Sequence, residues 1–382
     1  MRATYANIYL DNIKHNIEEI RKIIPSTTKM CVPVKADAYG HGAVNVSKIA
    51  IDCGVDYLAV AAVSEAIELR NAGINIPIIV LSIPNPSEIN DFFTFNLIPV
   101  VQDEEFLDLL ESICSQINTE ISIQLKIDTG MGRIGCHPED VMKLIKKIYS
   151  SKWIKLDGIF SHLPVSDSVL PEDIEYTNNQ IDLFKNIISQ VKEAGFNPGI
   201  CHISNSGGVL NYPEAMLDMV RPGLAIYGYY PGDISYDYLT ENNIEVSLLP
   251  AMELCSNIVA IRKMKKGQSI SYGRTWYAPY DCEIGVLPIG YGDGLLRNYG
   301  KNLQVSINGK NYPICGRICM DQCMVFLGTD SGISRWDKAV IFGPKNREAV
   351  LDASDIANYA ETIPYEITCG INKRVPRVFF AN

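Results

Sequence analysis

The sequence lacks the features that would place a protein in a membrane or on a nucleic acid. No stretch approaches the roughly 18 consecutive apolar residues that a membrane-spanning helix needs. The formal net charge is −10, and lysine and arginine are dispersed, whereas phosphate backbones are bound by clustered basic residues. Residues 1–16 contain no apolar segment of signal-peptide length. We therefore expect a cytoplasmic protein with neither a membrane nor a nucleic-acid partner.

Cysteine is present, but not in the patterns of metal or redox sites. The 11 cysteines include no C-x-x-C pair, and without an export signal we expect reduced thiols. Cys315, Cys319 and Cys323 recur every four residues, which on a helix would gather three ligands on one face. However, the flanking segments are typical of strands, and no histidine lies nearby in the sequence. Hence we expect no metal site.

Short apolar segments alternate with helical segments over the first part of the chain. The expected strands are 31–35, 56–60, 77–81, 98–101, 121–127, 156–161, 199–204 and 219–226. Segments with helical periodicity lie between them and include 64–72, 104–117, 139–149 and 175–193. This alternation predicts an α/β fold, a (β/α)8 TIM-like barrel. An open doubly wound sheet is the alternative, although no G-x-G-x-x-G follows the first strand.

A polar, turn-rich stretch at 229–243 leads into a different pattern. The expected strands are now 253–263, 268–272, 283–288, 303–307, 314–318, 323–327 and 339–342, with one helix at 354–361. Asn308-Gly309 is a strong hairpin signal. We therefore predict a barrel at residues 1–238 and a mainly β C-terminal domain at residues 239–382. Some of the N-terminal residues, about the first ten, are expected to pair with the second domain.

The most informative segment contains the end of the first expected strand. Val32-Pro33-Val34-Lys35 continues into Ala36-Asp37-Ala38-Tyr39-Gly40-His41-Gly42. An amine at the carboxyl end of a buried strand is partly desolvated, which lowers its pKa and suits Schiff-base chemistry. Tyr39 is placed to reach a phosphate at the same end. A surface lysine after an ordinary strand is the alternative, and the composition of the whole segment disfavours it.

Other polar residues follow later strands, where barrel enzymes place their chemistry. Lys126 lies in the fifth expected strand, and Arg133 follows a glycine turn from which its planar fork could clamp a carboxylate or a phenolate. His162 ends the sixth strand. Residues 202–208 end the seventh, and their small side chains suit phosphate binding or helix capping. Arg221 lies in the eighth.

Together these segments resemble the alanine racemase family, whose members use pyridoxal 5′-phosphate (PLP). The resemblance includes residues 125–135 and 218–228 and, in the second domain, 269–275, 290–294 and 316–322. It covers nearly the whole chain, and the segments occur in family order. It implies a cytoplasmic, homodimeric isomerase that interconverts L- and D-alanine by a two-base mechanism and supplies D-alanine for peptidoglycan.

The resemblance also implies a role for each matching residue. Lys35 would hold PLP covalently and act as the base on D-alanine, and Tyr272 of a second chain would act on L-alanine. Arg133 and Met320 would contact the substrate carboxylate, and Lys126 is a candidate carbamylated lysine that orients Arg133. Cofactor contacts are implied for Lys35, Tyr39, Arg133, His162, Asn205, Ser206, Arg221, Gly223, Leu224 and Tyr365.

Arg221 carries the most specific expectation about the reaction. In the family its counterpart faces the pyridine nitrogen, and because arginine cannot accept a proton it holds that nitrogen unprotonated. The ring is then a weaker electron sink, which should suppress transamination. The counterpart of Tyr365 narrows the substrate entrance and favours alanine over bulkier amino acids.

Three other functions fit parts of the pattern. A serine or broad-specificity racemase would need few changes at the entrance, so serine remains open as a substrate. A PLP-dependent decarboxylase shares the barrel-plus-β architecture, but Arg221 disfavours it because decarboxylation gains from a protonated pyridine. A non-enzymatic PLP-binding protein would resemble the barrel alone, so Tyr272 and the second domain argue against it.

Overall fold

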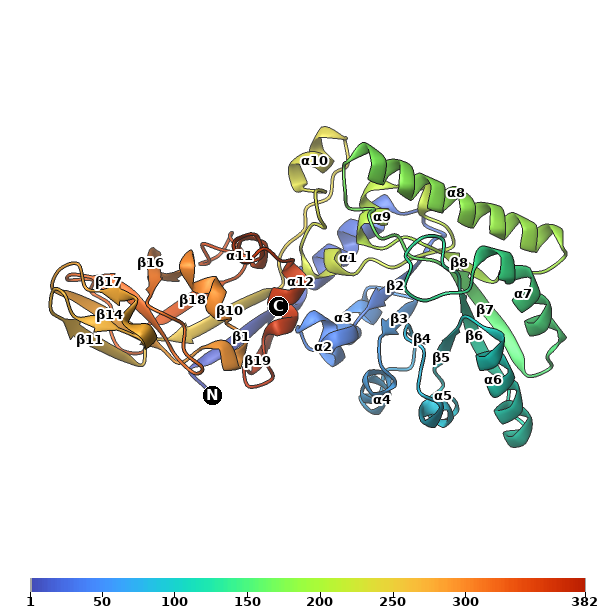
Figure 1. Ribbon diagram of the computed structural model, residues 1–382, viewed down its shortest axis with the longest axis horizontal. Helices are drawn as coiled ribbons and strands as arrows, with labels where there is room; N and C mark the ends of the chain where they lie inside the picture. The colour runs from blue at the N-terminus through green and yellow to red at the C-terminus, as the bar shows by residue number, and fades with distance from the viewer. Residues whose placement is uncertain (1, 382) are drawn as a thin grey trace.

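A computed structural model describes residues 2–381, which form two large sheets from different parts of the chain and one small strand pair (Figure 1). The first sheet is parallel, in the order β8-β7-β6-β5-β4-β3-β2-β9. Its strands are β2 (Lys29–Pro33), β3 (Tyr57–Val60), β4 (Ile78–Val80), β5 (Ile98–Val101), β6 (Ile121–Lys126), β7 (Ile154–Phe160), β8 (Ile200–His202) and β9 (Met219–Val220).

The two outer strands of this sheet approach each other and nearly close it. The backbone N–H of Asp218 donates to Cys201 at 3.0 Å, and that of Arg221 donates to Ser204 at 2.9 Å. The predicted (β/α)8 TIM-like barrel is thus confirmed, and the open doubly wound sheet is wrong.

Helices cover the outside of the barrel (Figure 1). They are α1 (Leu10–Ile23), α3 (Ala43–Asp52), α4 (Val63–Asn71), α5 (Ile89–Thr94), α6 (Glu104–Ile117), α7 (Val141–Ser150), α8 (Pro171–Glu193) and α9 (Ser206–Asn211). Helix α7 buries Val141, Leu144, Ile145 and Ile148, whose spacing forms one apolar stripe. Helix α6 begins at its predicted residue because Asp103 accepts a hydrogen bond from the N–H of Phe106 at 2.8 Å.

The second sheet has the order β11-β14-β17-β16-β15-β18-β10-β1-β19. Its strands are β1 (Thr4–Tyr9), β10 (Met252–Asn257), β11 (Ala260–Met264), β14 (Cys282–Leu287), β15 (Gln304–Ile307), β16 (Lys310–Cys315), β17 (Cys323–Gly328), β18 (Lys338–Phe342) and β19 (Arg377–Phe380). Strand β1, from the N-terminal part of the chain, lies antiparallel to β10 and parallel to β19. Asn308 and Gly309 both have positive φ in the β15–β16 turn, so the predicted hairpin is confirmed.

A few smaller elements complete the described chain. They are the strand pair β12 (Ser269–Ile270) and β13 (Trp276–Tyr277) and the helices α2 (Lys35–Tyr39), α10 (Tyr236–Glu241), α11 (Ala353–Ala360) and α12 (Pro364–Gly370). Helix α11 matches the predicted helix at 354–361 closely. The predicted division between residues 238 and 239 falls inside α10 and stays a prediction. None of the helices in residues 2–381 is long and apolar enough to cross a membrane.

Several expected strands are wrong in extent. The segment 268–272 is a strand only at Ser269–Ile270, with Tyr272 in a 3₁₀-helix, and the strand expected at 314–318 spans Lys310–Cys315. The segment 219–226 is a strand only at Met219–Val220, because Pro222 has no N–H for the ladder, and residues Leu224–Tyr227 form a 3₁₀-helix. The segment 253–263 is two strands: β10 pairs with β1 and β18, whereas β11 pairs with β14. The chain changes partners between Asn257 and Ala260, a long-range choice that local sequence does not encode.

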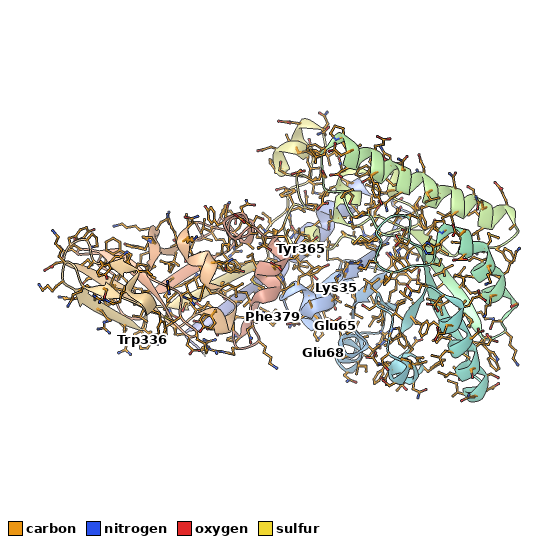
Figure 2. The ribbon with its side chains drawn as sticks, viewed as in Figure 1. Lys35, Glu65, Glu68, Trp336, Tyr365 and Phe379 are labelled. Atoms are coloured by element: carbon orange, nitrogen blue, oxygen red, sulfur yellow. The ribbon has the colours of Figure 1, made fainter. Side chains whose placement is uncertain are left out.

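The barrel and the second sheet meet beside the turn that follows Lys35. Figure 2 shows Lys35, Tyr365 and Phe379 at this junction, with Trp336 toward the far end of the second sheet. A Cβ placed on Gly42 would lie 2.7 Å from the Phe379 ring, so only glycine admits this contact. Arg377 donates to the carbonyl oxygen of Gly40 at 2.9 Å. The C-terminal strand therefore supports the lysine-bearing turn from outside the barrel.

Candidate active site

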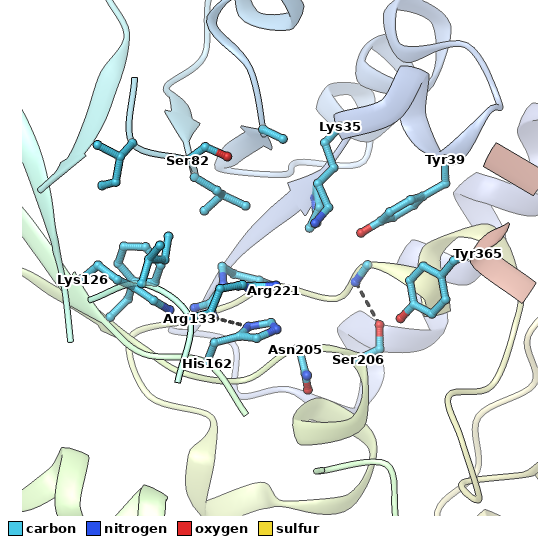
Figure 3. Close-up of a pocket in the computed structure, with 17 residues that line it drawn as sticks. Lys35, Tyr39, Ser82, Lys126, Arg133, His162, Asn205, Ser206, Arg221 and Tyr365 are labelled. Carbon is cyan, nitrogen blue, oxygen red and sulfur yellow. Dashed lines mark hydrogen bonds between the residues drawn. The ribbon is translucent and has the colours of Figure 1, made fainter. Parts of the chain in front are cut away.

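A cavity of about 520 Å³ lies at the carboxyl ends of the barrel strands (Figure 3). Four basic side chains line it: Lys35, Lys126, Arg133 and Arg221. The lining residues include no aspartate or glutamate within the described part of the chain. Low-dielectric walls of one charge sign concentrate the opposite charge, so the cavity favours a ligand with several anionic groups.

Lys35 begins a left-handed turn. Four successive non-glycine residues have φ between 51° and 53°: Ala36, Asp37, Ala38 and Tyr39. L-residues avoid this conformation at a cost of roughly 1–2 kcal/mol each. The strain persists because neighbours hold the turn: a carboxylate oxygen of Glu65 accepts from the N–H of Ala36 at 2.6 Å. Backbone strain of this kind is concentrated at functional sites, and here it directs two side chains into one cavity.

The Lys35 amine points into the cavity (Figure 3). Burial lowers the pKa of Lys35, and the nearby Arg133 guanidinium lowers it further. A larger fraction of the amine is therefore uncharged at neutral pH than in a solvated lysine. An uncharged amine is a nucleophile and a proton acceptor.

One end of the cavity is built from hydroxyl groups and backbone N–H groups. The Ser206 hydroxyl accepts from the N–H of Gly223 at 2.9 Å and from that of Ala225 at 3.2 Å. Asn205 caps α9 by accepting from the N–H of Gly208 at 2.9 Å. A Cβ on Gly223 would lie 2.9 Å from the Tyr39 hydroxyl. This glycine-lined cradle suits a phosphate.

Arg221 lies at the bottom of the cavity with 5% of its surface exposed. Its Nη2 donates to the Ser161 carbonyl at 2.7 Å, and its Nη1 lies 2.5 Å from Nδ1 of His202. A longer contact of 3.4 Å joins Nη2 to Nδ1 of His162 (Figure 3). Burial lowers the pKa of Arg221 to about 10, so the guanidinium stays charged at neutral pH. Because it only donates, a ligand atom facing it must be an acceptor.

Lys126 and His162 occupy the same cationic surroundings. The Lys126 Nζ lies 4.4 Å from the centre of the Phe160 ring. Burial, with the charges of Arg221 and Arg133, lowers the pKa of Lys126 well below its ordinary value. Burial and the charge of Arg221 do the same to the pKa of His162. His162 is therefore neutral at pH 7, and a larger fraction of the Lys126 amine is uncharged than in a solvated lysine.

The structure places most of the predicted site residues around this cavity. Those that line it are Lys35, Tyr39, Lys126, Arg133, His162, Asn205, Ser206, Arg221, Gly223 and Tyr365. Leu224 is buried beside Gly223 and is not part of the lining. Tyr272 and Met320, which are 72% and 52% exposed, belong to the second domain and do not line the cavity of their own chain. The individual roles stay predictions.

Sequence reasoning missed one wall of the cavity. Ala61 follows β3, and Leu81, Ser82 and Ile83 follow β4. The same rule that selected the other residues could have found them, since they end or follow the expected strands at 56–60 and 77–81. His202 was noticed only as part of a turn segment, whereas it is fully buried against Arg221.

These features define a barrel enzyme in which a lysine amine, a cradle suited to phosphate and a donor-only arginine surround one cavity. Comparison with known proteins identifies the family. The sequence-family model of the alanine racemase N-terminal domain matches residues 8–231, and the family model of the C-terminal domain matches residues 251–379. The chain therefore belongs to the alanine racemase family, as its resemblance predicted.

Relatives are similar over the full length of the chain. The alanine racemase of Treponema denticola is 48% identical over 381 residues, covering 99% of this chain and 98% of that protein. The alanine racemase of Treponema pallidum is 39% identical, covering 99% of this chain and 100% of that protein. The structure of alanine racemase from Clostridium difficile 630 has a TM-score of 0.93 at 36% identity, covering 100% and 97%. The structure of alanine racemase from Bacillus anthracis with bound L-Ala-P has a TM-score of 0.91 at 33% identity, covering 100% of this chain and 96% of that chain.

Alanine racemases depend on PLP, and the residues around the cavity fit this cofactor. Lys35 supplies an amine for its aldehyde carbon, and the cradle at Ser206 and Gly223 suits its phosphate. Arg221 suits an unprotonated ring nitrogen because it can only donate. The aldehyde, the phosphate and the ring nitrogen of PLP would thus each have a complementary group in this cavity.

Proposed function

We propose that this protein interconverts L- and D-alanine as a PLP-dependent alanine racemase. The observation that carries the proposal is the convergence of the Lys35 amine and the Arg221 guanidinium on one cavity with a phosphate cradle at its end. Bound PLP would acidify the α-hydrogen of an amino acid joined to it. The chain must then supply the groups that remove and return that proton.

Inversion at carbon requires proton acceptors on opposite faces of the substrate. Lys35 serves as the base on one face, which agrees with its lowered pKa. Tyr272 serves on the other, although it lies outside the cavity of its own chain and is largely exposed. We therefore propose a homodimer in which each chain presents Tyr272 and Met320 to the cavity of the other. A hollow beside Tyr272, lined also by Ser271 and Cys319, would face the partner.

Arg133 and Lys126 are assigned to the anionic parts of the ligand. Arg133 can clamp the substrate carboxylate or the phenolic oxygen of the cofactor with its planar fork. The lowered pKa of Lys126 favours its uncharged amine, and that form is suited to add carbon dioxide, releasing one proton and leaving a carbamate anion. This anion would offset the charges of Arg133 and Arg221, which both act on Lys126.

Alanine is the proposed substrate because the counterpart of Tyr365 narrows the substrate entrance in the family, and Tyr365 is present at the cavity of this chain. Tyr365 lines the cavity and packs edge-on against Tyr39, with ring centres 5.5 Å apart. This contact holds the Tyr365 ring at the cavity wall, and serine remains the second candidate substrate. We further propose that the enzyme acts in the cytoplasm and that its product supplies peptidoglycan synthesis.

The test is the formation of D-enantiomers from L-alanine and L-serine, measured in parallel. Wild type should form D-alanine faster than D-serine, and Lys35→Ala should form neither. Lys48→Ala is the matched control, because Lys48 is exposed on α3, and it should retain wild-type rates. Faster D-serine formation would change the substrate and keep the mechanism. No D-product from wild type with PLP bound would overturn the racemase proposal.

A further inference from the structure

A chain of polar side chains runs from Arg221 through the barrel interior, away from the cavity. Nη1 of Arg221 lies 2.5 Å from Nδ1 of His202. Nε2 of His202 lies 3.0 Å from Oε1 of Gln124, and Nε2 of Gln124 donates to Oδ2 of Asp157 at 2.6 Å. Gln124 and His202 are fully buried, and neither Gln124, His202 nor Asp157 lines the cavity.

The chemistry of its two ends determines the direction of every hydrogen bond in this chain. Arginine only donates, so Nδ1 of His202 must accept, and the imidazole proton resides on Nε2. Nε2 then donates to the amide oxygen of Gln124, whose amide nitrogen donates to the acceptor-only carboxylate of Asp157. One tautomer of His202 satisfies all three contacts. Burial and the charge of Arg221 also keep the pKa of His202 well below its ordinary value, so the ring stays neutral.

The backbone is irregular beside these hydrogen-bonded side chains. Strands β6 and β7 pair Ile123 with Leu156 but Gln124 with Gly158, which leaves Asp157 as the extra residue of a β-bulge. A bulge redirects a side chain, and here it accompanies the contact of Asp157 with Gln124. A Cβ on Gly158 would lie 2.9 Å from Oε1 of Gln124. Bulge and glycine therefore both accommodate the Gln124 amide.

The series of hydrogen-bonded side chains also connects Arg221 to the negative charge of Asp157. Arg221 has backbone carbonyl and histidine partners, and it has no ion-pair partner among the described residues. Burial raises the pKa of Asp157, so keeping an ionised carboxylate there costs free energy. Aligned hydrogen bonds polarise one another in a low-dielectric interior, and the carboxylate at one end strengthens the donors along the chain.

We propose that Gln124 and Asp157 are positioning residues that hold His202 in its Nε2-protonated tautomer and thereby hold the Arg221 guanidinium in place. This inference rests on the proposed function, in which Arg221 faces the cofactor ring. Without the Gln124 oxygen, the proton of His202 is free to reside on Nδ1, where it would oppose an arginine donor. Arg221 would then lose an acceptor and turn away from the cavity.

The test compares Gln124→Met, Asp157→Ala and wild type as full-length enzymes with bound PLP. ¹⁵N NMR of histidine-labelled protein reports which ring nitrogen carries the proton, and loss of a signal in His202→Asn identifies His202 among the five histidines. Wild type should show a protonated Nε2 and an unprotonated Nδ1. Both variants should show a mixture of tautomers, a kcat lowered about tenfold and a nearly unchanged KM.

Two further variants separate positioning from simple packing. Tyr57→Phe removes only a long 3.4 Å contact with the other oxygen of Asp157, so tautomer and kcat should match wild type. Gln124→Glu keeps the shape, and its protonated acid can both accept from His202 and donate to Asp157, so it should restore the wild-type signals. Asp157→Ala still tests the tautomer if Gln124→Met does not fold.

The outcomes are distinct. A wild-type tautomer in Gln124→Met, whatever its kcat, would overturn the positioning role, as would a mixed tautomer with wild-type kcat. A wild type with the expected ¹⁵N signals but no racemase activity would instead refute the proposed function.

Discussion

The carboxylate of Glu65 accepts a hydrogen bond from the backbone N–H of Ala36 at 2.6 Å. Its second oxygen accepts from the N–H groups of Ala61 and Ala62 at 2.8 and 3.0 Å. One side chain on α4 thus joins the left-handed turn after Lys35 to the end of β3. Such a residue stabilises a conformation that the turn would not adopt alone.

Glu65→Ala should therefore lower the free energy of unfolding and weaken PLP binding. Removing an acceptor from backbone donors costs about 1–3 kcal/mol when the donors are left unpaired. Urea unfolding and PLP titration would measure both effects. Glu68→Ala is the matched control, since Glu68 is exposed one turn along the same helix (Figure 2). Equal stability of the two variants would contradict this role for Glu65.

Gly223→Ala should weaken PLP binding without a comparable loss of stability. The new Cβ would meet the Tyr39 hydroxyl at 2.9 Å, and the Tyr39 ring cannot move freely because it packs edge-on against Tyr227 and Tyr365. We expect a rise in Kd of at least about tenfold, equivalent to about 1.4 kcal/mol. Gly370→Ala is the control, because no atom lies within 4 Å of its added Cβ. An unchanged Kd for Gly223→Ala would exclude this cradle from phosphate binding.

Mixing two inactive variants tests whether the active sites are shared. If Tyr272 acts across a dimer, Lys35→Ala and Tyr272→Phe chains should each be inactive alone. Random reassociation of equal amounts should restore about a quarter of wild-type activity, because half of the dimers are mixed and one of their two sites is complete. Refolding the chains together and measuring D-alanine formation gives the answer. No recovery, from mixtures shown to contain mixed dimers, would place both bases in one chain.

His41 should make the protein less stable as the pH falls. It is fully buried, and burial lowers its pKa to about 4, whereas the pKa of an unfolded histidine is about 6.5. Between these values the unfolded chain binds a proton that the folded chain does not, so the unfolding free energy decreases with falling pH. The contribution is on the order of 3 kcal/mol by pH 4 and is absent above pH 7.

The measurement is urea unfolding between pH 7 and pH 4. His41→Gln should show a shallower loss of stability than wild type, and His137→Gln, which changes an exposed histidine, should retain the wild-type slope. Identical slopes in His41→Gln and wild type would show that His41 is not the group responsible.

Most of the barrel and its site could be predicted because the information is local. Runs such as Ile98–Val101 are apolar and short, and helix α6 carries its own cap and stripe, so both appeared at their predicted residues. The residues that follow each strand converge because parallel strands end at the same rim. That rule alone brings Lys126, His162 and Ser206 to one cavity.

Long-range features could not be predicted in this way. About the first ten residues were expected to pair with the second domain, but no local pattern indicates that β1 lies between β10 and β19. The strand expected at 219–226 ends at Val220. Pro222 indicates such an end because it has no N–H, but the apolar residues that follow it favoured a longer strand.

The alternation of strands and helices, the order of the chemical groups along the rim and the family can all be recognised from the sequence. How those groups are held depends on the three-dimensional fold. Ala36 to Tyr39 contain no glycine, yet Glu65 and the C-terminal strand keep them left-handed. Nothing in the sequence distinguishes Asp157 from the other acidic residues, but a bulge in the structure brings it into hydrogen-bond contact with Gln124. The reason is physical: burial and partner contacts set backbone strain, tautomer and pKa, and these contacts join residues far apart in the chain.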